Sequence, residues 1–168
     1  MIHSEKRLSH LMRLLVLEIR STRVAYVVLE GPTSLLDWGI LHKTHVQSIL
    51  ERRLARLFLM SRPLTILISH NAKSKSGYRL IIRAVHKNAK EIGVPVLFMP
   101  RRAVLRYFVP GMRLNKYARA KMVAERFPTL SWRLPRERKS WQSEPVKIAI
   151  FDAAAAGVAY FLQVRDRE

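Results

Sequence analysis

Cysteine is absent from the 168 residues, and glycine occurs only six times. The first absence excludes disulfides, thiolate zinc sites and cysteine nucleophiles, and it favours a cytoplasmic location. The sequence also lacks a G-x-x-x-x-G-K-[ST] phosphate loop, a G-x-G-x-x-G dinucleotide turn and an H-E-x-x-H metal helix. The sequence therefore gives little support for nucleotide-dependent or zinc-dependent enzymes of these kinds.

Long apolar runs are also missing. The run over residues 11–19 is interrupted by Arg13 and lacks a small-residue cleavage site, so we expect no export signal. No apolar stretch approaches the ~20 residues that a membrane-spanning helix needs. We therefore expect a cytoplasmic protein that does not bind membranes.

Acidic residues are scarce, because 12 Asp and Glu stand against 31 Lys and Arg, which gives a formal net charge of +19. Folding does not require such an excess, and its natural partner is a polyanion. Membrane-binding chains gather their cations on one amphipathic helix or beside a membrane span. Here the cations are spread along the chain, which favours the extended phosphate backbone of a nucleic acid.

Apolar patterning predicts three strands near the start of the chain. Residues 14–19 form a continuous apolar run, which is typical of a strand covered on both faces. Residues 24–29 and 34–41 follow as further strand-like runs after short polar turns. Three strands joined by short turns make an antiparallel meander.

Helical and strand patterns then alternate. Helical spacing predicts helices over 46–62, 78–92 and 114–127, with strands at 64–69 and 94–99 between them. A basic loop at 128–145 precedes a last helix that begins near Pro145. Because β-α-β units imply parallel pairing, we expect a mixed five-stranded sheet flanked by helices, in one α/β domain over residues 1–168.

Glu18 and Asp152 are carboxylates embedded in apolar runs, where burial is costly without a cation, a metal or hydrogen bonds. The small residues at 153–157 would let the last helix approach the strand of Glu18 closely. Two carboxylates that meet in this way can hold a divalent ion, and paired ions drive many phosphodiester cleavages. The alternative is that Glu18 pairs with Arg20 or Arg23 and that Asp152 bridges locally.

The segment 101–139 is the strongest candidate for nucleic-acid binding, because it holds twelve cations and only two acids. Aromatic residues interleave or flank these cations, namely Tyr107, Trp132 and Trp141, and their ring faces could stack on unpaired bases. The alternative is a solvated charged face with aromatic residues in the core. The predicted nucleic-acid contacts are Arg101, Arg102, Arg106, Arg113, Lys116, Arg119, Lys121, Arg136, Arg138, Lys139, Trp132 and Trp141.

The element order and the acid positions together resemble the ribonuclease H-like superfamily, and within it the RuvC type of Holliday-junction resolvase. In that family the first strand carries an acid, a meander follows, and a late Ala-rich helix carries one or two further acids. Residues 15–19 (LVLEI) and 151–156 (FDAAAA) occupy these places, and residues 99–104 (MPRRAV) resemble the family's segment after its fifth strand. The resemblance implies a ribonuclease H-like fold, Mg²⁺ or Mn²⁺ as cofactor, DNA rather than RNA as ligand, and a homodimer.

Several residues depart from the family's pattern. The first-strand acid is Glu18 instead of Asp, the fourth strand ends in Ser69 and His70 where the family has Glu, and Ala155 replaces the second acid of the last helix. Within the resemblance, Glu18 and Asp152 would bind the metal. His70 or Glu144 would complete or assist the site, the latter only if the entry to the last helix folds back toward the sheet.

Three functions follow as hypotheses. The first is a metal-dependent endonuclease that acts on branched or structured nucleic acid. The second is a catalytically inactive ribonuclease H-like module that binds DNA or RNA. The third is a structural subunit of a nucleoprotein particle, in which the basic loop becomes ordered on assembly.

Overall fold

The sheet at the centre of the molecule joins an antiparallel meander to parallel strands, in the order β3-β2-β1-β4-β5. This computed structural model describes residues 12–20, 23–42, 46–70, 76–108, 115–139 and 141–167. The antiparallel strands are β1 (Arg13–Ile19), β2 (Arg23–Glu30) and β3 (Leu35–His42), and the strands parallel to β1 are β4 (Thr65–His70) and β5 (Val96–Pro100). The predicted mixed sheet of five strands is confirmed.

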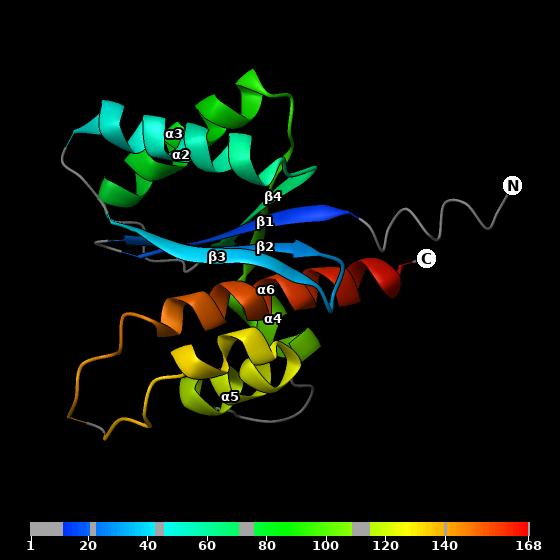
Figure 1. The fold of residues 1–168 in the computed structure, drawn as a ribbon. Coiled ribbons are helices and arrows are strands. Elements are labelled where there is room, and N and C mark those ends of the chain that lie inside the picture. The colour runs from blue at the N-terminus through cyan, green and yellow to red at the C-terminus, as the bar shows by residue number, and fades with distance from the viewer. Residues whose placement is uncertain are drawn as a thin grey trace, which may run out of the picture.

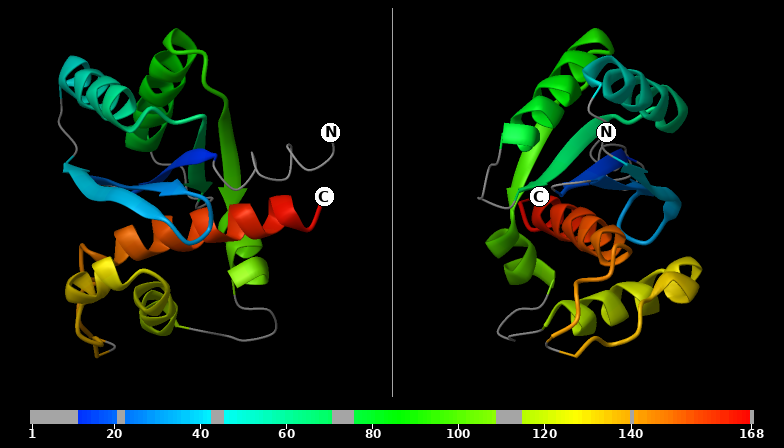
Figure 2. Two further views of the ribbon diagram at one scale, coloured as in Figure 1. Left: turned by 45° about the vertical axis from the view of Figure 1, so that its right-hand side comes forward. Right: turned by 90° about the vertical axis from the view of Figure 1, so that its left-hand side faces the viewer.

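Helices cover both faces of the sheet, which gives three layers (Figure 1 and Figure 2). One face carries α2 (Gln47–Ser61) and α3 (Ser76–Glu91). The other carries α4 (Arg101–Phe108), α5 (Lys116–Arg126) and α6 (Ile148–Arg165), and α6 packs directly on β1 and β2. A 3-10 helix, η1 (Pro128–Arg133), follows α5 and packs against it.

The alternation of side chains along β1 divides the core into two halves. Leu15 and Leu17 pack into the half under α2 and α3, whereas Leu14 and Val16 pack into the half under α6. Because successive side chains of a strand point to opposite faces, Glu18 follows Leu14 and Val16 toward α6. The fold thus places a carboxylate on the inner surface of the α6 layer.

α6 approaches the sheet closely because residues 153–157 are four alanines and a glycine, all of them buried. A Cβ atom at Gly157 would lie 2.4 Å from Leu29 Cδ1 and 3.0 Å from Val16 Cγ2. The helix backbone therefore lies directly on side chains of β1 and β2. This confirms the close approach that the small residues predict.

α6 is long and apolar enough, by length and composition alone, to cross a membrane, with 18 residues and a mean hydropathy of 1.4. The expectation that no apolar stretch of the chain approaches this length is therefore wrong. However, 67% of the helix is buried inside the structure. Its apolar side chains fill the core between the sheet, α4 and α5, as expected for the central helix of a folded domain.

Two elements differ from the sequence expectation. α4 was not predicted, because its eight residues follow β5 directly and are too few to show a helical period. The first part of the expected loop 128–145 is instead η1, whose Leu130 is fully buried. By contrast, Gly93 ends α3 as predicted, with a φ of 68° that an L side chain rarely adopts.

Candidate functional site

The site lies where β1 and β4 end, on the α6 side of the sheet. Glu18 is the second-last residue of β1 and stands opposite Ser69 of β4 in the parallel register. The Glu18 carboxylate accepts a hydrogen bond from Ser69 and is only 5% exposed. The carboxyl ends of strands in α/β sheets are where ligand sites usually form.

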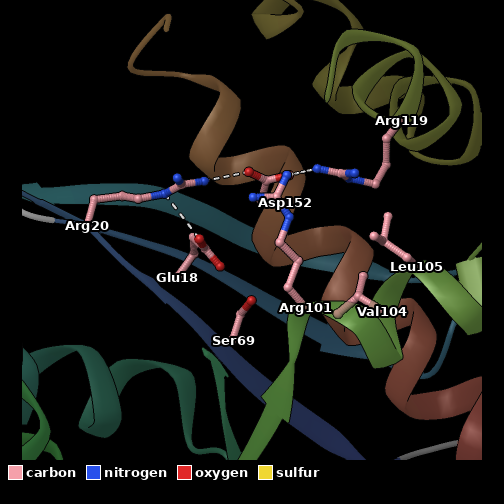
Figure 3. Close-up of a pocket in the computed structure, with 8 residues that line it drawn as sticks. All are labelled: Glu18, Arg20, Ser69, Arg101, Val104, Leu105, Arg119 and Asp152. Carbon is pink, nitrogen blue, oxygen red and sulfur yellow. Dashed lines mark hydrogen bonds and ion pairs between the residues drawn. The ribbon is translucent and has the colours of Figure 1, made fainter. Parts of the chain in front are cut away.

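Arg20 joins the acid of β1 to the acid of α6. Its Nε atom lies 3.1 Å from Glu18 Oε1, and its Nη2 atom donates a hydrogen bond of 2.5 Å to Asp152 Oδ2. Figure 3 shows the guanidinium reaching both carboxylates from the end of β1. Glu18 and Asp152 are therefore brought into one site as predicted, but an arginine of the same chain links them.

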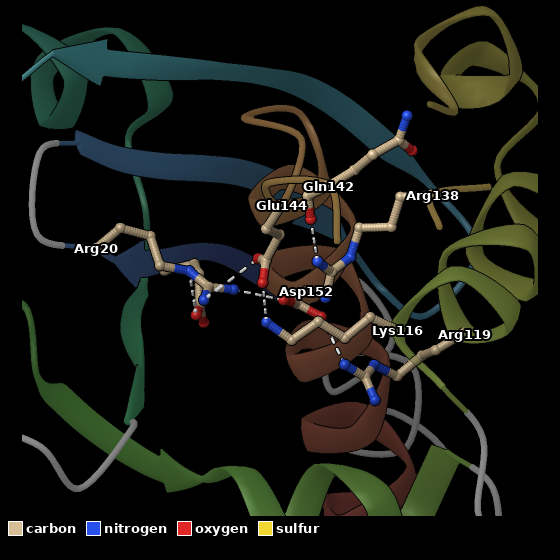
Figure 4. A network of polar contacts seen from close by, with 8 residues as sticks. Arg20, Lys116, Arg119, Arg138, Gln142, Glu144 and Asp152 are labelled. Carbon is tan, nitrogen blue, oxygen red and sulfur yellow. Dashed lines mark hydrogen bonds and ion pairs between the residues drawn. The ribbon is translucent and has the colours of Figure 1, made fainter. Parts of the chain in front are cut away.

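A second layer of cations surrounds these acids. Arg119 of α5 donates a hydrogen bond of 2.8 Å from Nη2 to Asp152 Oδ1, and its side chain is only 4% exposed. Glu144, which precedes α6, pairs with Lys116 and lies 3.6 Å from Arg20 Nη1. Figure 4 shows Arg20, Lys116 and Arg119 alternating with Glu144 and Asp152. We name these residues, together with Glu18, the ion-pair cluster.

Burial dominates the electrostatics of Glu18. Removal from water raises the pKa of Glu18 from 4.5 to about 7, although the charge of Arg20 and the Ser69 hydrogen bond both lower it. For Glu144, burial also raises the pKa, but the hydrogen bond and charge of Lys116, together with the charges of Arg20 and Arg138, leave the pKa below its ordinary value. The cluster thus holds one carboxyl that titrates near neutrality beside one that stays ionised.

A small pocket opens at the cluster. It is lined by Glu18, Arg20, Ser69, Arg101, Val104, Leu105, Arg119 and Asp152 (Figure 3). Three arginines and two carboxylates therefore share the space, and the cations are in the majority.

These residues do not fit a divalent cation. Such an ion prefers several oxygen ligands, but Arg20 already contacts both Glu18 and Asp152, and Arg119 contacts the second oxygen of Asp152. Two unit charges 4 Å apart repel by about 4 kcal/mol at an effective dielectric constant of 20, and a divalent ion would double this. Within the described residues, no group of three or more His, Asp or Glu side chains is arranged to hold a metal.

The other two predicted site residues, Glu144 and His70, differ in their position relative to the cluster. Glu144 does reach the cluster, because the entry to α6 folds back toward the sheet. The backbone of His70 ends β4 beside Ser69 and opposite Pro100 of β5, but its side chain lies outside the described part of the structure. A role for His70 stays a prediction.

No family model and no curated protein sequence matches the chain. Solved structures do. Thermus thermophilus RuvC in complex with a Holliday junction substrate superposes with a TM-score of 0.70 at 17% identity, over 92% of this chain and 96% of that one. The yeast mitochondrial Holliday junction resolvase gives a TM-score of 0.60 at 12% identity, over 90% of this chain and 80% of that one. Fowlpox virus resolvase in complex with Holliday junction DNA gives a TM-score of 0.56 at 17% identity, over 91% of this chain and 99% of that one.

The chain has a RuvC-like ribonuclease H fold. The resemblance seen in its first strand and last helix is thereby confirmed at the level of the fold, over nearly the whole chain. In this RuvC-like chain, Glu18 and Asp152 face each other across the β1–α6 contact as the resemblance implies, and Arg20 lies between them.

The predicted nucleic-acid contacts gather on the α4 and α5 side of the RuvC-like fold. The exposed ones are Arg101, Arg102, Arg106, Lys121, Arg136, Arg138, Lys139, Trp132 and Trp141. Arg119 is buried against Asp152 and does not belong to this exposed set, so its contact with nucleic acid stays a prediction. Lys116 is partly buried against Glu144, and Arg113 lies outside the described residues.

Two members of the site were not found from the sequence. Ser69 was noted only as a missing acid, and Arg20 only as a local partner of Glu18. The spacing does carry a signal, because residues 18 and 20 point to the same face of an extended chain. What it does not show is that Asp152 completes the pair from the far end of the sequence.

Proposed function

We propose that this chain is a nucleic-acid-binding RuvC-like protein that holds its ligand without hydrolysing it. The observation that carries the proposal is the guanidinium of Arg20, which contacts both Glu18 and Asp152. An arginine keeps its charge at every physiological pH and has no lone pair to accept a proton. In this position it neutralises the two acids but supplies neither a Lewis acid nor a general base.

Binding is supported by the surface beyond the cluster. Arg101, Arg102 and Arg106 are exposed along α4, and Lys121 is exposed on α5. Such cations displace the counterions of a phosphate backbone, so affinity falls steeply with salt. Two of the similar structures, Thermus thermophilus RuvC and fowlpox virus resolvase, were solved with Holliday junctions. We therefore propose DNA, and branched DNA in particular, as the ligand.

The second candidate function is a metal-dependent endonuclease. It is favoured by one observation, namely that Glu18 and Asp152 line the same pocket at the end of β1. For a metal to bind there, Arg20 would have to leave both carboxylates. The two functions therefore differ in one testable property, the response of the site to divalent ions.

The experiment compares binding and cleavage on one set of substrates. Labelled four-way junctions, duplexes and single strands, as DNA and as RNA, are incubated with the protein in EDTA, Mg²⁺ or Mn²⁺. We expect salt-sensitive binding in all three conditions, and no cleavage in any of them. The Glu18→Gln and Asp152→Asn double variant is the matched control.

Either part of the proposal can fail separately. Cleavage by the unmodified chain that the double variant lacks would establish the endonuclease instead. The absence of binding to every DNA and RNA at low ionic strength would remove both candidates.

A further inference from the structure

Two tryptophans on the α5 side of the molecule are left exposed by the fold. Trp132 of η1 is 66% exposed, and Trp141, between η1 and α6, is 76% exposed. Tryptophan is enriched at binding interfaces, where one end of its side chain is apolar and the other is wet. The cluster and the cationic surface on α4 do not account for either residue.

The backbone that carries Trp141 is held in a defined turn. The Gln142 N–H donates to the carbonyl of Lys139, and the Lys139 N–H donates to Gln142 Oε1, both at 3.0 Å. Arg138 Nη1 also donates to the Gln142 carbonyl, at 2.5 Å. Trp141 therefore stands on a turn that its neighbours close with three hydrogen bonds.

This turn is also fastened to the ion-pair cluster. We name residues 134–147, apart from residue 140, the arm. Figure 1 shows the arm extending past α5 and α6, away from the sheet. Glu144 joins the arm to Lys116 and Arg20, and Figure 4 shows Gln142 and Arg138 beside that contact. The arm thus holds Trp141 close in sequence to Glu144 of the ion-pair cluster.

The backbone around Trp132 is held in place by contacts between η1 and α5. Leu130 of the same 3-10 helix is fully buried, and Ser131 Oγ donates a hydrogen bond of 3.4 Å to the Ala124 carbonyl of α5. These contacts anchor η1 while the indole of the next residue remains in solvent.

Each indole has a cation over one side of its ring. Arg133 Cζ lies 4.0 Å from the Trp132 ring centroid, and Lys139 Nζ lies 5.3 Å from that of Trp141. With exposures of 66% for Trp132 and 76% for Trp141, most of the surface of each residue still faces solvent. An exposed ring beside a cation matches a nucleotide, whose base stacks while its phosphate meets the charge.

The net positive charge of the arm favours an anionic ligand. It carries four cations, at 136, 138, 139 and 147, against Glu137 and Glu144, and Glu144 is already paired with Lys116. An apolar peptide would not complement this surface, whereas a polyanion with planar rings would. Duplex bases are stacked on one another, so only unpaired bases offer a free face.

We propose that Trp132 and Trp141 form a stacking platform for unpaired nucleotides, which rests on the proposed nucleic-acid-binding function and names its ligand class. Trp141 lies on the arm, and Trp132 lies on η1, which packs against α5. The ligand would be a single strand, or the unpaired bases of a branched or distorted duplex.

The first test uses tryptophan emission. The chain has three tryptophans, so the Trp38→Phe and Trp132→Phe double variant leaves Trp141 as the sole reporter. We expect a single strand of about 20 nucleotides to quench this emission at saturation, because stacking on a base quenches indole. A duplex of the same sequence should leave the emission nearly unchanged.

The second test measures affinity by fluorescence anisotropy of labelled strands. We expect the Trp132→Ala and Trp141→Ala double variant to bind single strands at least about fivefold more weakly, and duplex within about twofold of the unmodified chain. The corresponding double Phe variant should recover most of the loss, because phenylalanine also stacks. Arg136→Ala is the matched charge control and should weaken both ligands alike.

The outcomes separate this inference from the proposed function. Unchanged single-strand affinity in the double Ala variant, or unchanged Trp141 emission with single strand bound, would overturn the platform while nucleic-acid binding stands. Equal losses for single strand and duplex would overturn it too. A chain that binds no nucleic acid at low ionic strength would refute the proposed function and the platform together.

Discussion

The replacement of Glu18 by Gln should stabilise the protein at alkaline pH. Glu18 is 5% exposed, and its burial raises its pKa to about 7 although Arg20 lies beside it. Glutamine keeps the shape of the side chain and its capacity to accept the hydrogen bond from Ser69. It removes only the charge that burial disfavours.

The magnitude follows from the pKa difference between the folded and unfolded states. The shift from 4.5 to about 7, at 1.36 kcal/mol per pKa unit, corresponds to about 3 kcal/mol. Because the folded state holds the proton more tightly, the unmodified chain loses this stability as the pH rises from 4.5 to 7. The loss is complete above pH 7, and Glu18→Gln should not show it.

The assay is urea unfolding of the two proteins between pH 5 and pH 8. We expect similar free energies of unfolding near pH 5 and a gain of up to about 3 kcal/mol for Glu18→Gln at pH 8. Glu30→Gln, which removes one charge from a partly exposed ion pair with Arg13, is the control for the loss of a carboxylate. If Glu18→Gln is no more stable than the unmodified chain at pH 8, the reasoning about burial is refuted.

Three further predictions concern the cluster, the α6 contact and the surface. Arg20→Ala should lower the free energy of unfolding at pH 8 by about 3 kcal/mol, because it leaves buried carboxylates without their partner. Addition of Mn²⁺ should then raise the melting temperature of this variant but not that of the unmodified chain. Gly157→Ala should lower the free energy of unfolding in urea by about 1–3 kcal/mol, since its Cβ would lie 2.4 Å from Leu29 Cδ1. If the double variant Gly157→Ala, Leu29→Ala loses the full sum of the two single losses, this contact is contradicted. Arg102→Ala with Arg106→Ala should lower the slope of log affinity against log salt for duplex DNA by about 1.8, and an unchanged slope would show that these residues do not contact phosphates.

The sheet and the meeting of the two acids could be predicted from local patterns. The continuous apolar run of β1 indicates a strand covered on both faces, and the small residues at 153–157 predict a helix that packs closely on it. These signals depend on neighbouring residues only, because strand alternation and helix packing repeat over a few positions. They were sufficient to bring Glu18 and Asp152 together.

The nature of the site depended on tertiary structure. Arg20 and Asp152 are separated by 132 positions, and nothing local shows that the arginine reaches past Glu18 to the helix acid. The burial of Arg119 was hidden for the same reason, since an arginine on an amphipathic helix resembles a solvated one until its partner is placed.

The sequence by itself determined a basic RuvC-like fold with two acids at its centre. Tertiary structure alone decided that arginines neutralise those acids and that two tryptophans remain in solvent. The physical reason is the separation along the chain over which each kind of signal acts. Periodicity acts over one or two turns of chain, whereas the pairing of buried charges is set by which side chains the finished fold brings within a few ångströms.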